Sequence, residues 1–195
     1  MEIPSSQAQQ SGSDKTARTR ERILAAAAAV VAAKGYENAT LAEIAEEAGY
    51  SIGALQGQFR SKLNLVVEAT RYALVNTLPP QQREHAVTRQ VERAVDPADA
   101  QLRSLNLEIC VAARRHPELA AAMLEVVEDR RARLQEGLEA GIEAGTIRAD
   151  LDRELLSIVL LALYGGLACR DAIGHPLPAS QDLVDCFATL LRPPD

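Results

Sequence analysis

The sequence predicts an all-α protein of nine helices, and three observations lead to that fold class. Alanine and leucine dominate the 195 residues, whereas aromatic side chains make up only 3% of them. Apolar residues recur at helical spacing, and runs that alternate apolar and polar residues, as half-buried strands do, are missing. Glycine and proline fall between the periodic segments, where helices begin and end. With 47% hydrophobic residues, the chain can bury a sizeable core.

The N-terminal third contains several signals for short helices. Residues 1–17 are polar and are expected to form a flexible tail. The first helix is predicted from about Arg18 to Lys34, with Gly35 placed to end it. Thr40 and Glu43 form a capping-box pattern that opens a helix from Leu41 to Gly49. Two further helices follow, one capped by Ser51 and running to Phe59, the other capped by Ser61 and running to the Pro79-Pro80 break.

The rest of the chain reads as longer amphipathic helices separated by Pro and Gly. Their predicted ranges are Gln81–Val95, Ala98–Arg115, Glu118–Ala144, Arg153–Ile173 and Ser180–Leu191.

Charge and composition exclude several classes of function. The net charge is −6, yet residues 1–62 hold seven Lys or Arg and seven Asp or Glu, so the whole deficit lies in residues 63–195. Any nucleic-acid contact must therefore come from a local basic face in the neutral first third. The three cysteines and three histidines form no ligand pattern, and nucleophile-elbow and phosphate-loop motifs are missing. We expect no metal, no cofactor, no catalytic residue and no enzymatic activity.

The longest uncharged apolar run, Leu155 to Cys169, has 15 residues, which is fewer than the ~18–20 that a bilayer requires. The chain also lacks a positively charged start followed by an apolar segment. We therefore expect a cytoplasmic protein without a membrane partner.

The segment from Leu41 to Phe59 predicts a helix-turn-helix. Two helices this short are unstable alone, so they must cross tightly. Ala45 is small where they approach, Gly49 permits the turn, and Leu55 fills the angle between them. An ordinary helical hairpin has the same spacing, so the spacing by itself leaves both interpretations open.

The wider context resembles the tetracycline-repressor (TetR-like) family. Three stretches carry the resemblance, and they lie within Arg20 to Ala69: R-x-R-I-L-A-A-A, K-G-Y-x-x-A-T-L-A-E-I-A-E-E-A-G-Y-S-I-G-A-L and Q-F-R-S-K-L-N-L. The resemblance implies a three-helix DNA-binding domain over residues 18–62, with the helix-turn-helix at about 41–60. It also implies a helical effector-binding and dimerisation domain over residues 63–195, and a repressor released from its operator by a small molecule.

The sequence departs from the family pattern at Gln56-Gly57, where members commonly carry Tyr and a polar residue. Glycine inside a helix costs about 1 kcal/mol relative to alanine. We expect the departure to affect which DNA is bound and how tightly.

The predicted DNA contacts fall into two classes on a near-palindromic duplex bound by a homodimer. Thr40, Lys62, Arg18 and Arg20 are expected to contact the phosphate backbone or the minor groove, setting affinity and salt dependence. The face that reads bases is expected to contain Ser51, Ile52, Gly53, Gln56 and Gln58, with Gln56 as the best reader of adenine. Leu55 and Phe59 are expected to be core.

Two further sites are predicted in the C-terminal part. An unidentified effector is expected between the helices 81–95, 98–115 and 118–144, lined by Leu102, Asn106, Ile109, Met123 and Val127. The absence of Trp disfavours an aromatic cage and favours a mostly aliphatic ligand. Arg130, Arg131 and Arg133 are interpreted as a solvated face. The dimer interface is expected to contain Leu155, Val159, Leu163, Leu167, Phe187, Leu190 and Leu191.

Two other classes of function remain open. A helical enzyme with a carboxylate-bridged metal is disfavoured by the lack of Glu-x-x-His. An interaction adaptor that has lost DNA binding is kept open by Gln56-Gly57.

Overall fold

The computed structural model describes residues 6–75 and 85–193, and these form an all-α architecture. Nine α-helices lie in these two stretches, in the order α1 (Ser6–Asn38), α2 (Leu41–Ala48), α3 (Ile52–Gln58), α4 (Lys62–Val75), α5 (Ala86–Arg93), α6 (Ala100–Ala113), α7 (Pro117–Glu143), α8 (Arg153–Ala172) and α9 (Ser180–Leu191). A short 3-10 helix, η2 (Pro97–Asp99), precedes α6. The prediction of nine helices is confirmed over this part of the chain.

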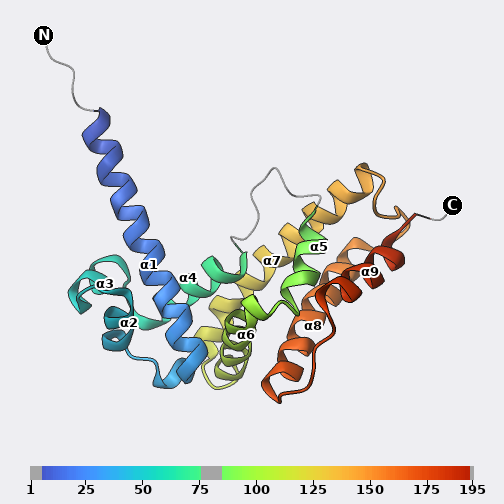
Figure 1. Ribbon diagram of the computed structural model, residues 1–195. Coiled ribbons are helices and arrows are strands. Elements are labelled where there is room, and N and C mark those ends of the chain that lie inside the picture. Colours follow the sequence, from blue (N-terminus) through green and yellow to red (C-terminus); the bar gives the residue numbers. More distant parts are fainter. Residues whose placement is uncertain (1–5, 76–84, 194–195) are drawn as a thin grey trace, which may run out of the picture.

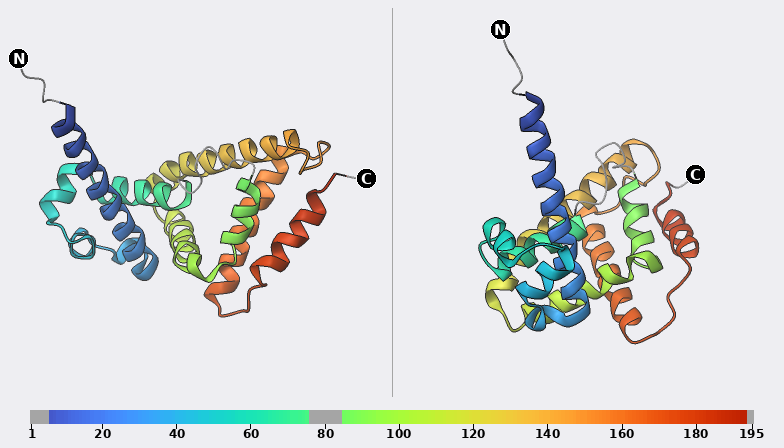
Figure 2. Two further views of the ribbon diagram at one scale, coloured as in Figure 1. Left: turned by 45° about the horizontal axis from the view of Figure 1, so that its top comes forward. Right: turned by 60° about the vertical axis from the view of Figure 1, so that its left-hand side comes forward.

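The helices are arranged with α2 and α3 beside α1 at one end of the molecule, and α8 and α9 at the other (Figure 1). The N-terminal end of α1 projects away from the body in both views of Figure 2. Helices α4, α6 and α7 lie between the two ends, with α4 in contact with both α1 and α7. A change in the position of α4 can therefore affect both ends of the molecule.

The first helix is longer than the sequence predicts. A flexible tail was expected over residues 1–17, but α1 already begins at Ser6, and residues 1–5 lie outside the described part of the chain. Once a helix exists, each added residue gains a hydrogen bond without a new nucleation cost, so a polar segment can extend it. At the other end Gly35 has a φ of 80°, which interrupts the helix where the sequence predicts its end.

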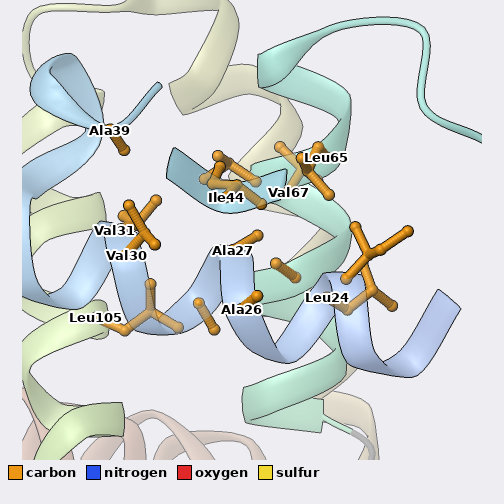
Figure 3. Close-up of a cluster of buried hydrophobic side chains, with 14 of the residues drawn as sticks. Leu24, Ala26, Ala27, Val30, Val31, Ala39, Ile44, Leu65, Val67 and Leu105 are labelled. Carbon is orange, nitrogen blue, oxygen red and sulfur yellow. The ribbon is translucent and has the colours of Figure 1, made fainter. Parts of the chain in front are cut away.

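The largest hydrophobic core joins the N-terminal helices to the C-terminal part. Ala27 and Val31 of α1, Ile44 of α2 and Leu65 of α4 are all fully buried in it. Leu105 of α6 packs into the same cluster, as Figure 3 shows. The predicted domain boundary near residue 62 therefore does not separate two cores, because one hydrophobic core contains residues from both sides of it.

The C-terminal helices match most of their predicted ranges. Helices α7, α8 and α9 agree with prediction to within one residue at each end. The predicted helix over residues 81–95 is observed from Ala86 to Arg93, and its first residues, 81–84, lie outside the described chain, as does the Pro79-Pro80 break. The predicted helix over residues 98–115 is split, because the Asp96 side chain accepts a hydrogen bond from the amide of Ala98 and starts η2 instead.

Helix α8 has more exposed apolar surface than a core helix. The helix is long enough to cross a membrane, and its most apolar 18-residue window has a mean hydropathy of 1.6. Only 28% of the residues in that window are buried within the chain. The expectation drawn from the 15-residue uncharged run counted only the uncharged residues and missed this. Three large apolar side chains of α8, Leu155, Ile158 and Val159, are thus exposed in a single chain.

Candidate functional site

The start of α2 is fixed by the predicted capping box. The Thr40 hydroxyl accepts a hydrogen bond from the amide of Glu43, and the Glu43 carboxylate accepts one from the amide of Thr40. Lys34 adds an ion pair to Glu43 at 2.7 Å. The hydrogen bonds from Lys34 and from Thr40 lower the pKa of Glu43 to about 2, so the carboxylate is charged at physiological pH. Thr40 remains exposed, as a phosphate contact must be.

The turn between α2 and α3 is held from behind by α1. Gly49 has a φ of 72°, in the left-handed region that glycine favours, and it ends α2. Arg22 donates to the carbonyl of Ala48 at 3.1 Å, and its guanidinium lies over the ring of Tyr50. Ser51 then caps α3 by accepting a hydrogen bond from the amide of Ala54. These contacts fix the angle at which α3 leaves the body.

Helix α3 has one buried and one exposed face. Leu55 and Phe59 are 1% and 4% exposed, which confirms that both belong to the core. Ile52, Gly53 and Gln56 are exposed. Of the other predicted base readers, Ser51 is exposed while serving as the cap, and Gln58 is only partly exposed. Most of the predicted reading residues are therefore exposed, and Gln56 is the long polar side chain among those that are fully exposed.

The predicted phosphate-binding cations differ in how free they are. Arg18 is exposed. Arg20 forms an ion pair with Glu68 of α4 and lies over the ring of Phe59. Lys62 donates to the carbonyl of Glu37 at 3.1 Å and lies over the ring of Tyr36. Burial lowers the pKa of Lys62, and a phosphate would have to compete with its contact to Glu37.

Arg60 was missed by the sequence analysis. It lies two residues after the end of α3 and is exposed. The signal was present in the F-R-S-K stretch, where a cation sits one residue after the last core residue of the helix. Its position makes it a candidate phosphate contact alongside Arg18.

A cavity of about 80 Å³ lies between α4, α6 and α7. Four of the five predicted ligand residues line it: Asn106, Ile109, Met123 and Val127. Leu102 instead packs in a separate cluster with Leu74 and Tyr164. The prediction placed residues 81–95 at this site, whereas α4 supplies the wall through Thr70 and Leu74.

Arg130 also lines this cavity, which corrects its interpretation as part of a solvated face. Its neighbour Arg131 does face solvent and pairs with Glu128. One helical residue turns by about 100°, so adjacent arginines on α7 point in different directions. The guanidinium of Arg130 lies 5.1 Å from the centre of the Tyr164 ring.

The predicted dimer residues divide between outer surface and core. Leu155, Val159 and Leu190 are 58%, 47% and 60% exposed, and Leu163 and Phe187 are partly exposed. Leu167 and Leu191 are instead buried within the chain, in two of its own core clusters. Ile158, 50% exposed on α8, was missed. The corrected apolar surface, which we call the α8–α9 face, consists of Leu155, Ile158, Val159, Leu163, Phe187 and Leu190.

Two short crossed helices with a buried angle and an exposed polar face define a helix-turn-helix DNA-binding protein. The family model described as bacterial regulatory proteins, tetR family, matches residues 23–69, which span α2, α3 and parts of α1 and α4. Residues 23–69 of this chain thus match the DNA-binding domain of the tetR family of transcriptional regulators, the family that the sequence resembles.

Relatives match over nearly the whole chain. The HTH-type transcriptional repressor AcnR of Corynebacterium efficiens is 28% identical over 184 residues, covering 93% of this chain and 97% of that protein. A solved TetR-family regulator from Rhodococcus sp. is similar with a TM-score of 0.76 at 19% identity, covering 90% of this chain and 99% of that one. FadR from Bacillus subtilis, solved in complex with stearoyl-CoA, has a TM-score of 0.64 at 18% identity, covering 87% and 95%.

Proposed function

We propose that the protein is a cytoplasmic repressor that binds a near-palindromic operator as a homodimer and is released by a small-molecule effector. The observation that carries the proposal is the exposed face of α3, held rigidly by buried Leu55 and Phe59 and by the contacts of Arg22. The repressor name of the relative AcnR supports the direction of control.

The DNA contacts sort into two classes in this proposal. Gln56 reads a base, because its amide can form two hydrogen bonds with adenine, and Gly53 allows α3 to approach the groove closely. Ser51, Ile52 and Gln58 complete that surface. Thr40, Arg18, Arg20, Lys62 and the newly identified Arg60 bind phosphate and carry no sequence information.

The homodimer is supported by the α8–α9 face. Leu155, Ile158, Val159 and Leu190 are large, apolar and exposed in a single chain. Large exposed apolar patches mark interaction surfaces. Two copies of this face, related by a two-fold axis, would form a four-helix interface and place both copies of α3 on one side of a duplex.

The proposal is tested by selecting fragments of the source genome on the full-length protein and measuring their affinity by fluorescence anisotropy. We expect selected fragments to bind at least about 10³ times more tightly than random duplex. Gln56→Ala should cost about 1–3 kcal/mol on the selected fragment and little on random DNA. Gln181→Ala, which alters an exposed glutamine of α9, is the control and should change neither.

If Gln56→Ala lowered the affinity for selected and random DNA equally and changed the salt slope, Gln56 would be assigned to the phosphate contacts. Failure to prefer any fragment over random duplex would overturn the proposal and favour the adaptor alternative. Among the described side chains, in residues 15–75 and 85–193, no group of three His, Cys, Asp or Glu lies where it could hold a metal ion. Metal analysis of the purified protein decides the metal-enzyme alternative.

A further inference from the structure

Arg130, which is only partly exposed, differs from the two buried arginines of the C-terminal part. Arg93 and Arg103 are 7% and 2% exposed, and each pairs with a carboxylate, Arg93 with Asp99 at 3.3 Å and Arg103 with Asp171 at 2.7 Å. Arg130 lies among the same helices, and within the described residues no carboxylate pairs with it. A partly buried charge without a carboxylate partner is less well solvated than one in water, and this site carries one positive charge in excess.

The neutral neighbours of Arg130 form only weak interactions with its guanidinium. Its Nη1 donates to the side-chain oxygen of Asn106 at a long 3.4 Å. The ring of Tyr164 covers one face of the guanidinium, and the Tyr164 hydroxyl is itself buried without a hydrogen-bond partner among the described residues. Burial lowers the pKa of Arg130, but a guanidinium remains protonated in proteins, so the charge persists.

The rest of the cavity is mainly apolar. Its aliphatic lining comprises Leu74, Ile109, Ala113, Met123, Val126 and Val127. A ligand that suits this cavity has one anionic group for the guanidinium and an aliphatic body for the lining. One guanidinium neutralises one negative charge, which fits a carboxylate better than a phosphate carrying about 1.5–2 charges at pH 7.

We propose that the effector is an aliphatic monocarboxylate whose carboxylate binds Arg130 and Asn106, with its body lying between α4, α6 and α7. This proposal deepens the proposed function and rests on it. A positively charged effector is excluded by the same arrangement, because it would meet an unpaired guanidinium.

The cavity is small, and the widening that a ligand requires would link effector binding to DNA release. Ligand pockets usually measure about 300–1,000 Å³, so the observed 80 Å³ must widen to admit a ligand. Thr70 and Leu74 form the α4 wall. On the same helix, Glu68 pairs with Arg20 of α1, and Arg71 pairs with Glu125 and Asp129 of α7. A displaced α4 therefore pulls on α1, which supports the reading helix.

The experiment compares acids with their neutral analogues. Thermal unfolding and calorimetric titration are carried out on the full chain with straight-chain carboxylates from acetate to octanoate, each paired with its primary amide. At least one acid should bind about tenfold or more tightly than its amide, since hydrogen bonds to charged groups exceed neutral ones by that order. Binding of amide and acid with equal affinity, or of no acid, would overturn the proposal, as would binding of inorganic phosphate in preference to every acid.

Two arginine variants test whether Arg130 supplies the positive charge that binds the carboxylate. Arg130→Met should abolish the preference for acid over amide, whereas Arg131→Met, on the solvent side of α7, should keep it. Equal loss in both variants would show that the preference arises from the general charge of α7, contrary to the proposal. The acid–amide comparison in the native protein needs no variant, so the proposal stays testable if Arg130→Met fails to fold.

A final measurement separates this proposal from the proposed function. The best acid should weaken binding of the selected genomic fragment by the same factor by which that DNA weakens acid binding. Specific DNA binding that no bound acid alters would overturn the effector proposal and leave the DNA-binding function intact. Loss of specific DNA binding altogether would instead be a failure of the proposed function.

Discussion

The two ends of the molecule place their positive charges in opposite ways. Around α3, Arg18 and Arg60 are exposed, where DNA can reach them. In the C-terminal part, Arg93 and Arg103 are buried with carboxylate partners, and Arg130 lines a cavity without one. The first arrangement suits a large polyanion that stays outside the fold, and the second suits a single anionic group that enters it. The protein is acidic overall, with a net charge of −6, and its basic groups can still act locally at two different sites.

The largest expected effect concerns the α8–α9 face, on which the paired geometry of the N-terminal end depends in the proposed homodimer. Val159→Glu puts a charge on this apolar face and should convert the proposed dimer to monomer. Loss of the second half-site should weaken operator binding by about 10²–10⁴-fold, the range over which linked sites reinforce each other. Sedimentation at micromolar concentration together with operator titration measures both effects.

Leu124→Glu is the matched control, because Leu124 is an exposed leucine of α7 outside the α8–α9 face. A native protein that sediments only as monomer would contradict the proposed interface.

The next effect tests which cations at the N-terminal end are free. Arg60→Ala and Lys62→Ala should each lower the salt slope of DNA binding by about one, alike for operator and random duplex. Between 50 and 200 mM salt, that corresponds to about a threefold to fourfold smaller loss of affinity per contact. Titrations at several salt concentrations measure the slopes. An unchanged slope for Lys62→Ala would assign Lys62 to the structural contact with Glu37 and Tyr36 alone.

Substituting the two glycines of the reading helix should give a smaller effect, with a gain in stability at both positions and a loss of operator affinity at Gly53. Gly53 and Gly57 are both exposed, and a methyl group at Gly57 would meet no other atom. Alanine at either position should raise the free energy of unfolding by up to about 1 kcal/mol, because glycine is a poor helix former. Gly53→Ala should also weaken operator binding, since Gly53 lies on the proposed groove side. Chemical denaturation and anisotropy test this, and unchanged operator affinity in Gly53→Ala would place α3 further from the bases.

The smallest effect is a pH dependence at the cap of α2. The pKa of Glu43 is about 2 in the folded protein, below its ordinary 4.5, so its contribution is present above pH 4.5 and is lost as the pH falls towards 2. Glu43→Gln should reduce stability at neutral pH and flatten the acid side of the stability profile. Glu47→Gln, on the same helix, is the control. Parallel profiles for the native protein and Glu43→Gln would contradict this role.

The sequence predicted the N-terminal end well because its signals are local. Thr40 and Glu43, Gly49 and Ser51 fix helix ends within a few residues of themselves, and the structure contains each of these features. The long helices have ends marked by Pro and Gly, which were also predictable. Their orientation about their own axes is not encoded locally, because it depends on which helices pack around them.

Three corrections illustrate the non-local part. Arg130 was interpreted as solvent-facing from its charged neighbours, but its side chain lines the cavity beside α4 and α6 and lies over the Tyr164 ring of α8. Leu167 and Leu191 were assigned to the dimer interface, but the chain's own clusters bury both. In each case the sequence shows an apolar or charged stripe along a helix. Whether that stripe faces the core or the solvent depends on residues distant in the sequence that pack against it.

A hydroxyl-radical footprint of the selected genomic fragment tests most directly whether two copies of α3 read one duplex. We expect two protected tracts centred about 34–36 Å apart, or a near multiple of that spacing, with half-sites related by a near-palindrome. Protection should disappear in Val159→Glu and persist in Leu124→Glu. A single unpaired tract, or uniform protection without a preferred site, would contradict this expectation.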